Sequence, residues 1–241
     1  MTRFLIFLFL AMNVLVTGAF ADTLTVAAGA GYKRMVGEII QAYENKTGQK
    51  VDAIYGDMKE IMTQARAGEN VALVLGEHNF LKASDVQFTS FPKLGKGILA
   101  LAFCKNVKLN KPEDLTGSKI FKVGIANPNK TIYGKAAKEF LENSGLYKQI
   151  EKKIMLIPTC PKILESLLGG EIQAGFVNLT EAIYLKDRLG GYIVVDQEKY
   201  KPINLVFGVI QGFENRPETV QFLRFLQSHP EVKDIIHRSG L

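Results

Sequence analysis

Cysteine and histidine, on which most zinc, redox and thiol chemistry depends, are scarce in this chain of 241 residues. The two cysteines, Cys104 and Cys160, do not form a Cys-x-x-Cys motif. The three histidines, His78, His229 and His237, show no metal-ligand spacing. Redox and zinc motifs are therefore not expected. The two cysteines could form one disulfide, provided that their Cα atoms lie within about 7 Å of each other.

The sequence also lacks a basic stripe interleaved with aromatic residues, the pattern of many nucleic-acid-binding surfaces. Its lysines alternate with acidic residues, so the positive charge is dispersed along the chain. Without Arg3, which lies in the N-terminal segment, 29 lysines and arginines stand against 24 acidic residues, a formal charge of +5. We expect no nucleic-acid partner and a field that mildly favours small anions.

Long apolar runs are confined to the N-terminus. Residues 4–16 are almost wholly apolar, a short basic start precedes them, and residues 19–21 offer small side chains for cleavage. The run is short for a spanning helix, so residues 1–21 are predicted to be a signal peptide, with an uncleaved anchor as the alternative. No cysteine directly follows that could accept a lipid. We expect the mature chain to start at Asp22 and to work in the periplasm.

No low-complexity tract and no repeat of solenoid period interrupts the mature chain, which alternates between short apolar runs and helical patterns. One such pattern is the stripe of Met35, Ile39 and Tyr43, closed by Gly48. Helices are predicted near 35–47, 58–67, 110–115, 134–143, 161–168, from 180, and at 217–227 and 230–237. Strands are predicted at 24–28, 51–55, 71–75, 98–103, 122–126, 154–157, 174–177, 192–195 and 203–209, with residues 80–91 irregular.

The alternation of strands and helices restarts in the middle of the chain. Each half is too small for a generous core of its own, so an α/β fold of two lobes is predicted. Strands 98–103 and 203–209 are candidates for the crossings between the lobes. We assign residues 22–104 and 204–241 to the first lobe and 105–203 to the second, with a ligand cleft between them.

The stretch 125–141 is typical of one wall of such a cleft. It predicts the end of a buried strand, a polar turn around Pro128 and a helix entered near Gly134. A unit of this kind points free backbone N–H groups out of the carboxyl end of a sheet. We therefore expect an anion or another small ligand to bind here.

Three segments carry a resemblance to a known family: Ile125-Ala-Asn-Pro with Tyr133-Gly-Lys-Ala-Ala-Lys-Glu, Gly169-Gly-Glu-Ile-Gln-Ala-Gly-Phe-Val, and the C-terminal Val220-Gln-Phe-Leu-Arg-Phe-Leu with Ser239-Gly-Leu. Over nearly the whole mature length the chain resembles the periplasmic molybdate-binding (ModA-like) proteins of ABC importers. The resemblance implies the two-lobed type 2 periplasmic binding protein fold. It also implies a monomeric receptor without cofactor or catalysis, which captures a small oxyanion such as molybdate or tungstate and delivers it to a membrane permease.

In that family neutral donors hold the oxyanion: serine and tyrosine hydroxyls and backbone N–H groups at helix starts. Tyr133 and Lys162 would need to offer only backbone N–H groups, and Asn178 stands where the family has its donor tyrosine. Carried over by resemblance, the ligand-binding positions are Ala30, Gly31, Tyr32, Asp57, Met58, Lys59, Tyr133, Lys162 and Asn178.

The departures from the family pattern are concentrated at these positions. Gly31 replaces a serine, and the serine-rich loop after the second strand has become 56–59, Gly-Asp-Met-Lys, without a hydroxyl. Asp57 either caps a helix, which is worth about 1 kcal/mol, or stands beside the ligand. Three lysines near the cleft either supply it with positive charge or are simply solvated: Lys33, Lys59 and Lys162.

Three other functions stay open on the sequence alone. The first is a receptor for a metal or metal complex, held by Asp57, Glu77 and His78 with or without a cysteine. The second is an enzyme with His78 as base and a cysteine as nucleophile. There Cys160 is favoured over Cys104, because the start of a helix can lower a thiol pKa. The third is an accessory or sensory receptor that no longer serves transport. We expect the oxyanion receptor, and no enzyme.

Overall fold

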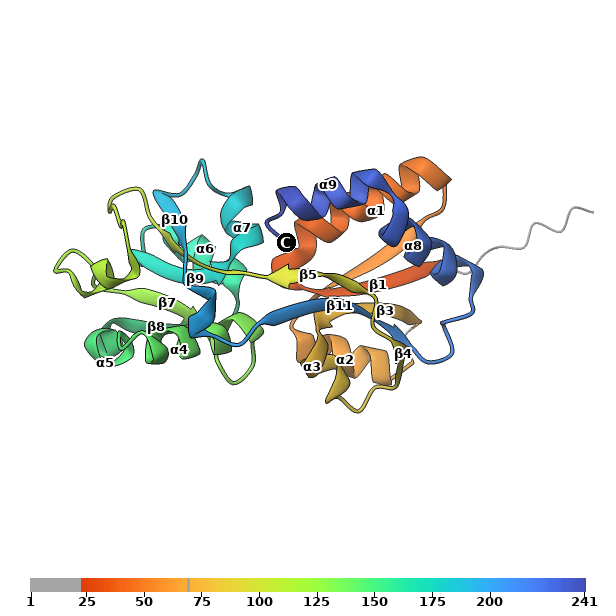
Figure 1. Cartoon of the computed structure of the whole chain (residues 1–241), viewed down its shortest axis with the longest axis horizontal. Coiled ribbons are helices and arrows are strands. Elements are labelled where there is room, and N and C mark those ends of the chain that lie inside the picture. The colour runs from red at the N-terminus through yellow and green to blue at the C-terminus, as the bar shows by residue number, and fades with distance from the viewer. Residues whose placement is uncertain (1–22, 69) are drawn as a thin grey trace, which may run out of the picture.

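The computed structural model of the chain describes residues 23–68 and 70–241. The predicted signal peptide and the start of the mature chain at Asp22 lie outside the described residues. Figure 1 shows two lobes side by side along the long axis, each with its own sheet. No helix within the described ranges has both the length and the apolar composition of a membrane span.

The sheet of the first lobe is centred on β1 (Leu24–Gly29). This strand pairs in parallel with β2 (Val51–Gly56) on one side and with β3 (Val71–Glu77) on the other. The apolar runs of β1 and β3 are almost fully buried, as expected for parallel strands with helices on both faces. Antiparallel strands continue the sheet beyond β3: β11 (Ile203–Ile210), β4 (Phe88–Ser90) and β5 (Lys93–Gly97).

The order of these strands explains where the helices lie. The chain steps from β1 to β2 in one direction and from β2 past β1 to β3 in the other, so right-handed crossovers place the two connecting helices on opposite faces. In Figure 1, α1, α8 and α9 cover one face and α2 and α3 the other. These helices are α1 (Lys33–Thr47), α2 (Met58–Arg66), α3 (His78–Lys82), α8 (Pro217–Ser228) and α9 (Pro230–Arg238).

The second lobe repeats this plan. Its strand β7 (Val123–Ala126) pairs in parallel with β8 (Ile154–Ile157) and β9 (Ala174–Asn178), and the order β8-β7-β9 matches β2-β1-β3. Two antiparallel strands, β6 (Leu99–Phe103) and β10 (Gly191–Val194), complete the sheet. Its helices are α4 (Ile132–Asn143), α5 (Tyr147–Ile150), α6 (Cys160–Leu168) and α7 (Leu179–Tyr184). Short 3₁₀ turns occupy Ala30–Tyr32, Pro112–Thr116, Glu151–Lys153 and Gln197–Lys199.

Two segments connect the lobes, one between β5 and β6 and one between β10 and β11. They touch where Gly97 pairs with Ile203. A Cβ atom on Gly97 would lie 2.8 Å from the Ile203 side chain and 2.4 Å from the Tyr133 hydroxyl, so only glycine fits this passage. Strand pairing places Leu99–Phe103 in the second sheet, so the first crossing falls near Ile98 and not at residue 104.

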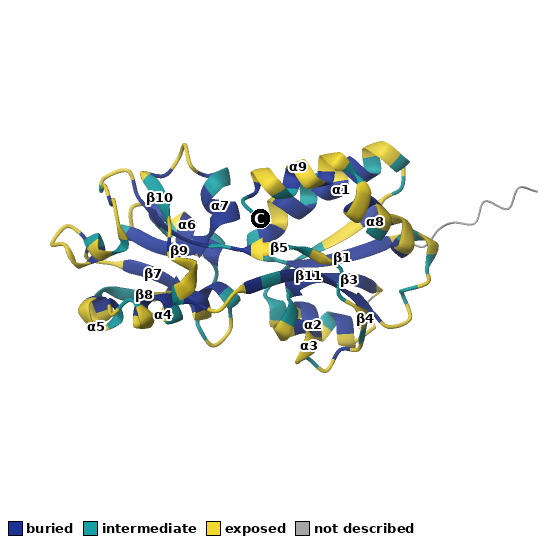
Figure 2. Ribbon diagram, in the orientation of Figure 1, coloured by how far each residue is buried: buried dark blue, intermediate teal, exposed yellow. Residues whose placement is uncertain are grey.

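Burial follows the sequence pattern. Figure 2 shows buried residues along the strands and the inward helix faces, and exposed residues on the outer faces. The predicted stripe of α1 is buried through Met35, Ile39 and Tyr43. The helix ends at Gly48, whose φ of +71° lies in the left-handed region that glycine adopts without strain.

Several short elements, among them α5, were not predicted from the sequence. Residues 80–91, predicted to be irregular, contain most of α3 and all of β4. The helix forms because the Glu77 side chain caps it by accepting a hydrogen bond from the backbone N–H of Phe80. Strand β5 (Lys93–Gly97) was not predicted either, because its sequence is polar and glycine-rich.

Candidate functional site

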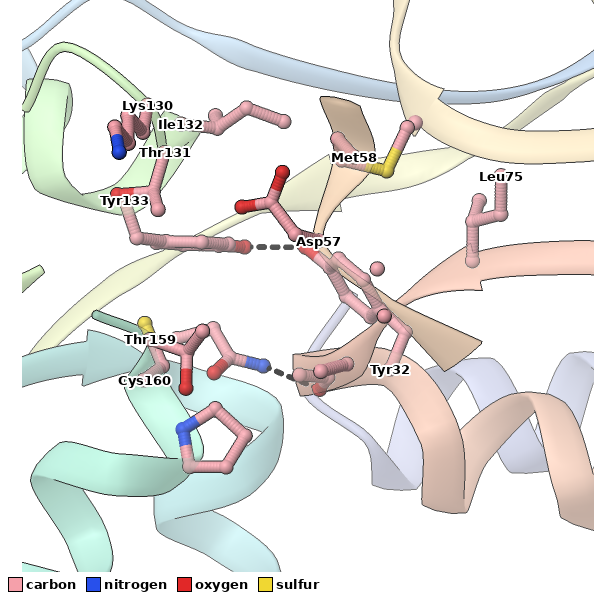
Figure 3. A pocket seen from close by; sticks show the side chains of 17 residues that line it. Tyr32, Asp57, Met58, Leu75, Lys130, Thr131, Ile132, Tyr133, Thr159 and Cys160 are labelled. Carbon is pink, nitrogen blue, oxygen red and sulfur yellow. Dashed lines mark hydrogen bonds between the residues drawn. The ribbon is translucent and has the colours of Figure 1, made fainter. Parts of the chain in front are cut away.

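The carboxyl ends of the parallel strands in both sheets meet at one cavity between the lobes, shown in Figure 3. This is the position expected for a ligand, because in each lobe the strand order reverses beside the central strand and leaves a crevice there. The cavity has a volume of about 80 Å³, which is room for a few waters or one compact anion. It is lined by Gly29, Ala30, Gly31, Tyr32, Gly56, Asp57, Met58, Leu75, Gly76, Lys130, Thr131, Ile132, Tyr133, Thr159, Cys160, Pro161 and Asn178.

The first lobe contributes the turns after β1 and β2. The turn after β1 presents the backbone of Gly31 and the buried ring of Tyr32. The turn after β2 contains Asp57, whose carboxylate caps α2 by accepting a hydrogen bond of 2.8 Å from the Lys59 backbone N–H. Asp57 therefore caps a helix and also faces the cavity. The two roles that the sequence left open for it, helix cap and neighbour of the ligand, are compatible.

The second lobe contributes the starts of α4 and α6. The Thr131 hydroxyl caps α4 by accepting from the Gly134 N–H, and Thr159 caps α6 by accepting from the Lys162 N–H. A Cβ on Gly134 would lie 2.2 Å from the carbonyl oxygen of Ala126. Glycine is thus needed for α4 to begin this close to the end of β7. Two helix N-termini, each the positive end of a helix dipole, consequently face the cavity.

Two tyrosines join the lobes across the cavity. The hydroxyl oxygens of Tyr32 and Tyr133 are 2.5 Å apart, and the ring centroids are 6.4 Å apart (Figure 3). Both side chains are buried, and burial raises the pKa of each hydroxyl above its usual value. Both tyrosines are therefore neutral at physiological pH; one O–H is used in the bond between them, and the other can donate a hydrogen bond to an anion.

Asn178, at the end of β9, makes a second bridge between the lobes. Its Nδ2 donates to the carbonyl oxygen of Gly31 over 2.9 Å. The side chain is buried, and its Oδ1 has no hydrogen-bond partner among the described residues. This oxygen has almost no accessible surface, so the acceptor stays unpaired where the two lobes meet.

The cysteines lie apart and are free thiols. Strands β6 and β9 run antiparallel with Leu99 opposite Asn178, so Cys104 lies beyond the far end of the strand pair, roughly 15 Å from the cavity that Cys160 lines. That separation is too long for a disulfide. Burial raises the pKa of Cys160 to about 12, so the expectation of a lowered thiol pKa at this helix start is wrong.

Polar contacts also join the lobes outside the cavity. Glu181 of α7, a buried carboxylate, lies 3.5 Å from Arg34 of α1. The Tyr184 hydroxyl donates to Glu38 over 2.7 Å, and Arg238 contacts the other oxygen of Glu38 at 2.6 Å. The Glu181–Arg34 and Tyr184–Glu38 contacts span both lobes, so they exist only while the lobes are together, whereas Arg238 and Glu38 both belong to the first lobe.

Seven of the nine predicted site residues line the cavity: Ala30, Gly31, Tyr32, Asp57, Met58, Tyr133 and Asn178. Lys59 and Lys162 do not line it. The Lys59 side chain is exposed, and the Lys162 ammonium pairs with Glu165 of its own helix at 2.6 Å. Lys33 lies outside the lining as well, with its ammonium 5.9 Å from the Tyr55 ring centroid.

Sequence reasoning missed several lining residues, chiefly Thr131, Thr159 and Lys130. The threonines could have been found as helix caps, because each stands three residues before a backbone N–H that it accepts from. Lys130 carries no such signal. It is the only lysine or arginine among the residues that line the cavity.

The residues weighed for a metal site have other partners. Glu77 caps α3, and the His78 ring packs edge-on against Phe91 with centroids 5.0 Å apart. Within the described chain no three His, Cys, Asp or Glu side chains are grouped so that they could hold a metal ion.

Two α/β lobes, joined by two crossing segments and closed over a cavity at their switch points, define a two-lobed binding protein. A family model described as bacterial extracellular solute-binding protein matches residues 24–241, and the chain belongs to this family. The predicted fold class and the predicted kinship with molybdate-binding proteins are both confirmed.

Individual relatives agree with this assignment. A binding protein of Haemophilus influenzae is 29% identical over 88% of each chain. The molybdate-binding protein ModA of Rhodobacter capsulatus is 24% identical over 92% of this chain and 89% of its own. The solved periplasmic molybdate-binding protein of Azotobacter vinelandii has a TM-score of 0.80 at 18% identity, covering 90% of this chain and 97% of its own. The chain is thus a solute-binding protein of the kind that serves ABC transporters.

Proposed function

We propose that this protein captures a small oxyanion in the cavity between its lobes, acts as a monomer in the periplasm, and delivers the anion to an ABC permease. Its molybdate-binding relatives make molybdate and tungstate the first candidates. One observation carries the proposal: the donors that converge on the cavity are neutral and come from both lobes. They are the O–H that the Tyr32–Tyr133 pair leaves free and the positive N-terminal ends of α4 and α6.

Donors of this kind suit a dehydrated anion. Hydrogen bonds from neutral O–H and N–H groups to an ionised acceptor are about twice as strong as those between neutral groups. They also need no buried counter-charge, which would itself be costly to desolvate. Lys130 adds a positive charge at the exposed edge of the cavity, where it can attract anions without being buried.

Isothermal titration of the mature protein, residues 22–241, against molybdate, tungstate, sulfate, thiosulfate, phosphate and arsenate tests the binding half of the proposal. We expect saturable one-to-one binding with at least one of them. Absence of binding with all six would refute the oxyanion assignment. The chain has no tryptophan, so the fluorescence of its eight tyrosines, which include Tyr32 and Tyr133, gives an independent readout of binding.

Delivery is tested in cells. Deletion of the gene should lower uptake of the radiolabelled anion at low external concentration, and the wild-type gene should restore it. Uptake that is unchanged in the deletion strain, with binding intact in vitro, would contradict the transport role and favour an accessory or sensory receptor.

A further inference from the structure

We propose that the tip of the second lobe binds the surface of a bilayer that contains anionic phospholipids. This lysine tip is the segment 105–122, which connects β6 to β7 and combines exposed lysines with an exposed phenylalanine. The surface is separate from the ligand cavity, so it does not depend on which anion binds there. It places the receptor beside a membrane, where a permease of the proposed kind would reside.

The fold gathers at this tip positive charge that looks dispersed along the sequence. Residues 105–122 contain five lysines against two acidic residues, which accounts for half of the formal charge of +6 of the whole chain. All five lysines are exposed, and four of them line one open hollow: Lys105, Lys108, Lys111 and Lys119, with Lys122 beyond it. Within the described chain no ion pair includes any of the five. Their charge is therefore available to an anionic surface.

Hydrogen bonds within the second lobe already fix the shape of the tip. The carboxylate of Asp114 accepts from the backbone N–H groups of Asn110 and Lys111, over 2.7 and 3.2 Å. The ammonium of Lys153, directly before β8, donates to the three carbonyl oxygens of residues 115–117, each at 3.0 Å. Because the loop is held in this way, little backbone freedom is lost when its lysines meet a surface.

Phe121 gives the tip an apolar side chain in contact with solvent. It is 70% exposed, the largest fraction among the exposed large hydrophobic residues of the described chain. Its backbone N–H and that of Lys122 both donate to the side-chain oxygen of Gln173, over 3.1 and 2.9 Å, so this segment is held in place. Single exposed apolar side chains are common, but this one stands between Lys119 and Lys122. An aromatic ring flanked by lysines is typical of segments that lie at a membrane interface.

A bilayer suits both halves of this surface. Each lysine close to an anionic membrane strengthens binding by about fivefold. The ring of Phe121 can enter the boundary between head groups and acyl chains, while the lysine ammonium groups stay among the phosphates. A soluble polyanion would pair with the lysines but leave the ring in water. The combination of charge and exposed ring therefore favours a bilayer.

The tip lies at the end of the second lobe opposite the cavity. Lys122 precedes the amino end of β7, whereas the carboxyl end of this strand leads to Thr131 and Tyr133 in the cavity lining. In Figure 1 the loops between β6 and β7 form the end of the molecule that is remote from the first lobe. Contact with a bilayer at this end leaves the cavity accessible and the first lobe free to move.

Vesicle flotation tests the proposal with the untagged mature protein, residues 22–241. One set of vesicles is neutral phosphatidylcholine, and the other contains about 30% phosphatidylglycerol, at an ionic strength near 0.1 M. We expect binding to the anionic vesicles to be at least about tenfold stronger than to the neutral ones, and to weaken as salt is added. Absence of binding to the anionic vesicles, or equal binding to both sets, would overturn the proposal.

Two variants test the two halves of the surface. The triple variant Lys105→Gln, Lys108→Gln and Lys119→Gln should bind anionic vesicles about 100-fold more weakly, at about fivefold for each lysine. Phe121→Gln should lower binding about tenfold, because the ring no longer leaves water. All four side chains are exposed, so the fold should be unaffected, and the thermal unfolding midpoint should match that of the wild type.

The matched controls lie on the first lobe. The triple variant Lys46→Gln, Lys82→Gln and Lys233→Gln makes the same change in net charge with exposed lysines of α1, α3 and α9. Phe80→Gln removes another exposed phenylalanine, 38% exposed, from α3. Both controls should bind anionic vesicles within about twofold of the wild type. A control triple that binds as weakly as the tip triple would show that net charge acts instead of the tip, and would refute the proposal.

The remaining outcomes are also decisive. Weakening in the tip triple but not in Phe121→Gln would refute the bilayer as partner and indicate a soluble polyanion. Titration of the tip variants with the small anions should give wild-type affinities, because the tip does not line the cavity. Failure of all small anions to bind would refute the proposed function but leave the vesicle result standing, so the two proposals fail separately.

Discussion

The hydroxyl pair of Tyr32 and Tyr133 gives a prediction about how the lobes close. Each tyrosine belongs to a different lobe, and both hydroxyls are buried when the lobes are together. In Tyr133→Phe, the Tyr32 hydroxyl is left buried without that partner, at a cost of about 1–3 kcal/mol. When the lobes open, water hydrates the same hydroxyl and the cost disappears. The penalty therefore applies to the closed form alone.

That cost sets the size of the effect. At about 1.4 kcal/mol for each factor of ten, the closed-to-open ratio should fall about 5-fold to 150-fold in either single variant, Tyr32→Phe or Tyr133→Phe. The double variant replaces both partners with apolar rings of similar shape, a change that is nearly neutral for a buried pair. We expect the double variant to be more closed than either single variant.

Small-angle scattering of the ligand-free mature protein measures this directly, because opening increases the radius of gyration. The control is Tyr43→Phe, whose hydroxyl bonds to Gln49 within the first lobe at 2.5 Å and should not affect opening. A double variant as open as the singles, or more open, would show that the two hydroxyls do not stabilise closure as a pair.

Three further predictions concern stability and reactivity. Gly134→Ala should destabilise the fold by about 1–3 kcal/mol in urea unfolding, because its Cβ would lie 2.2 Å from the carbonyl oxygen of Ala126. By contrast Gly37→Ala, in the middle of α1 and with its nearest neighbour at 3.9 Å, should stabilise it by about 0.5–1 kcal/mol; the reverse order would contradict the packing described. Burial raises the pKa of Glu181 above its ordinary 4.5, although Arg34 partly offsets this. A carboxyl group with a raised folded-state pKa favours folding below pH 4.5 and loses that contribution as the pH rises through the folded-state value. Unfolding of Glu181→Gln should therefore depend less on pH over that window than unfolding of the wild type, and parallel curves would refute the assignment. Finally, the pKa of about 12 and the burial of Cys160 predict slow labelling by iodoacetamide near pH 8 in a Cys104→Ser background. Labelling should be faster in Tyr133→Phe, which opens the cavity, and an equal rate would argue against that opening.

Much of the fold could be predicted because its strands are short apolar runs separated by clear helix signals. The predicted strand 154–157 agrees with β8, and Gly48 ends α1 as expected. Strand β5 could not be found, because Lys93–Gly97 has no apolar alternation and becomes a strand only through its pairing with β11. Helix α3 is short and depends on a cap from Glu77.

The site was predictable in position but not in its contacts. The resemblance located seven cavity residues, since loops after parallel strands keep their place even when their side chains change. It could not show that Tyr32 meets Tyr133, or that Asn178 reaches Gly31, because these pairs are 101 and 147 residues apart in sequence. The direction of the Cys160 pKa was mispredicted for a related reason: the sequence shows the helix start, whereas burial depends on the opposite lobe.

The capped helix starts have a thermodynamic consequence. The cavity walls are turns that connect strand ends to helices. The caps of these helices are already formed, by Asp57, Thr131 and Thr159. No segment of the described walls has to fold when the ligand arrives, so binding should proceed as a movement of two preformed bodies. The heat-capacity change of binding should then be small and negative, corresponding to the area that the two lobes and the ligand bury together, without the large contribution of coupled folding.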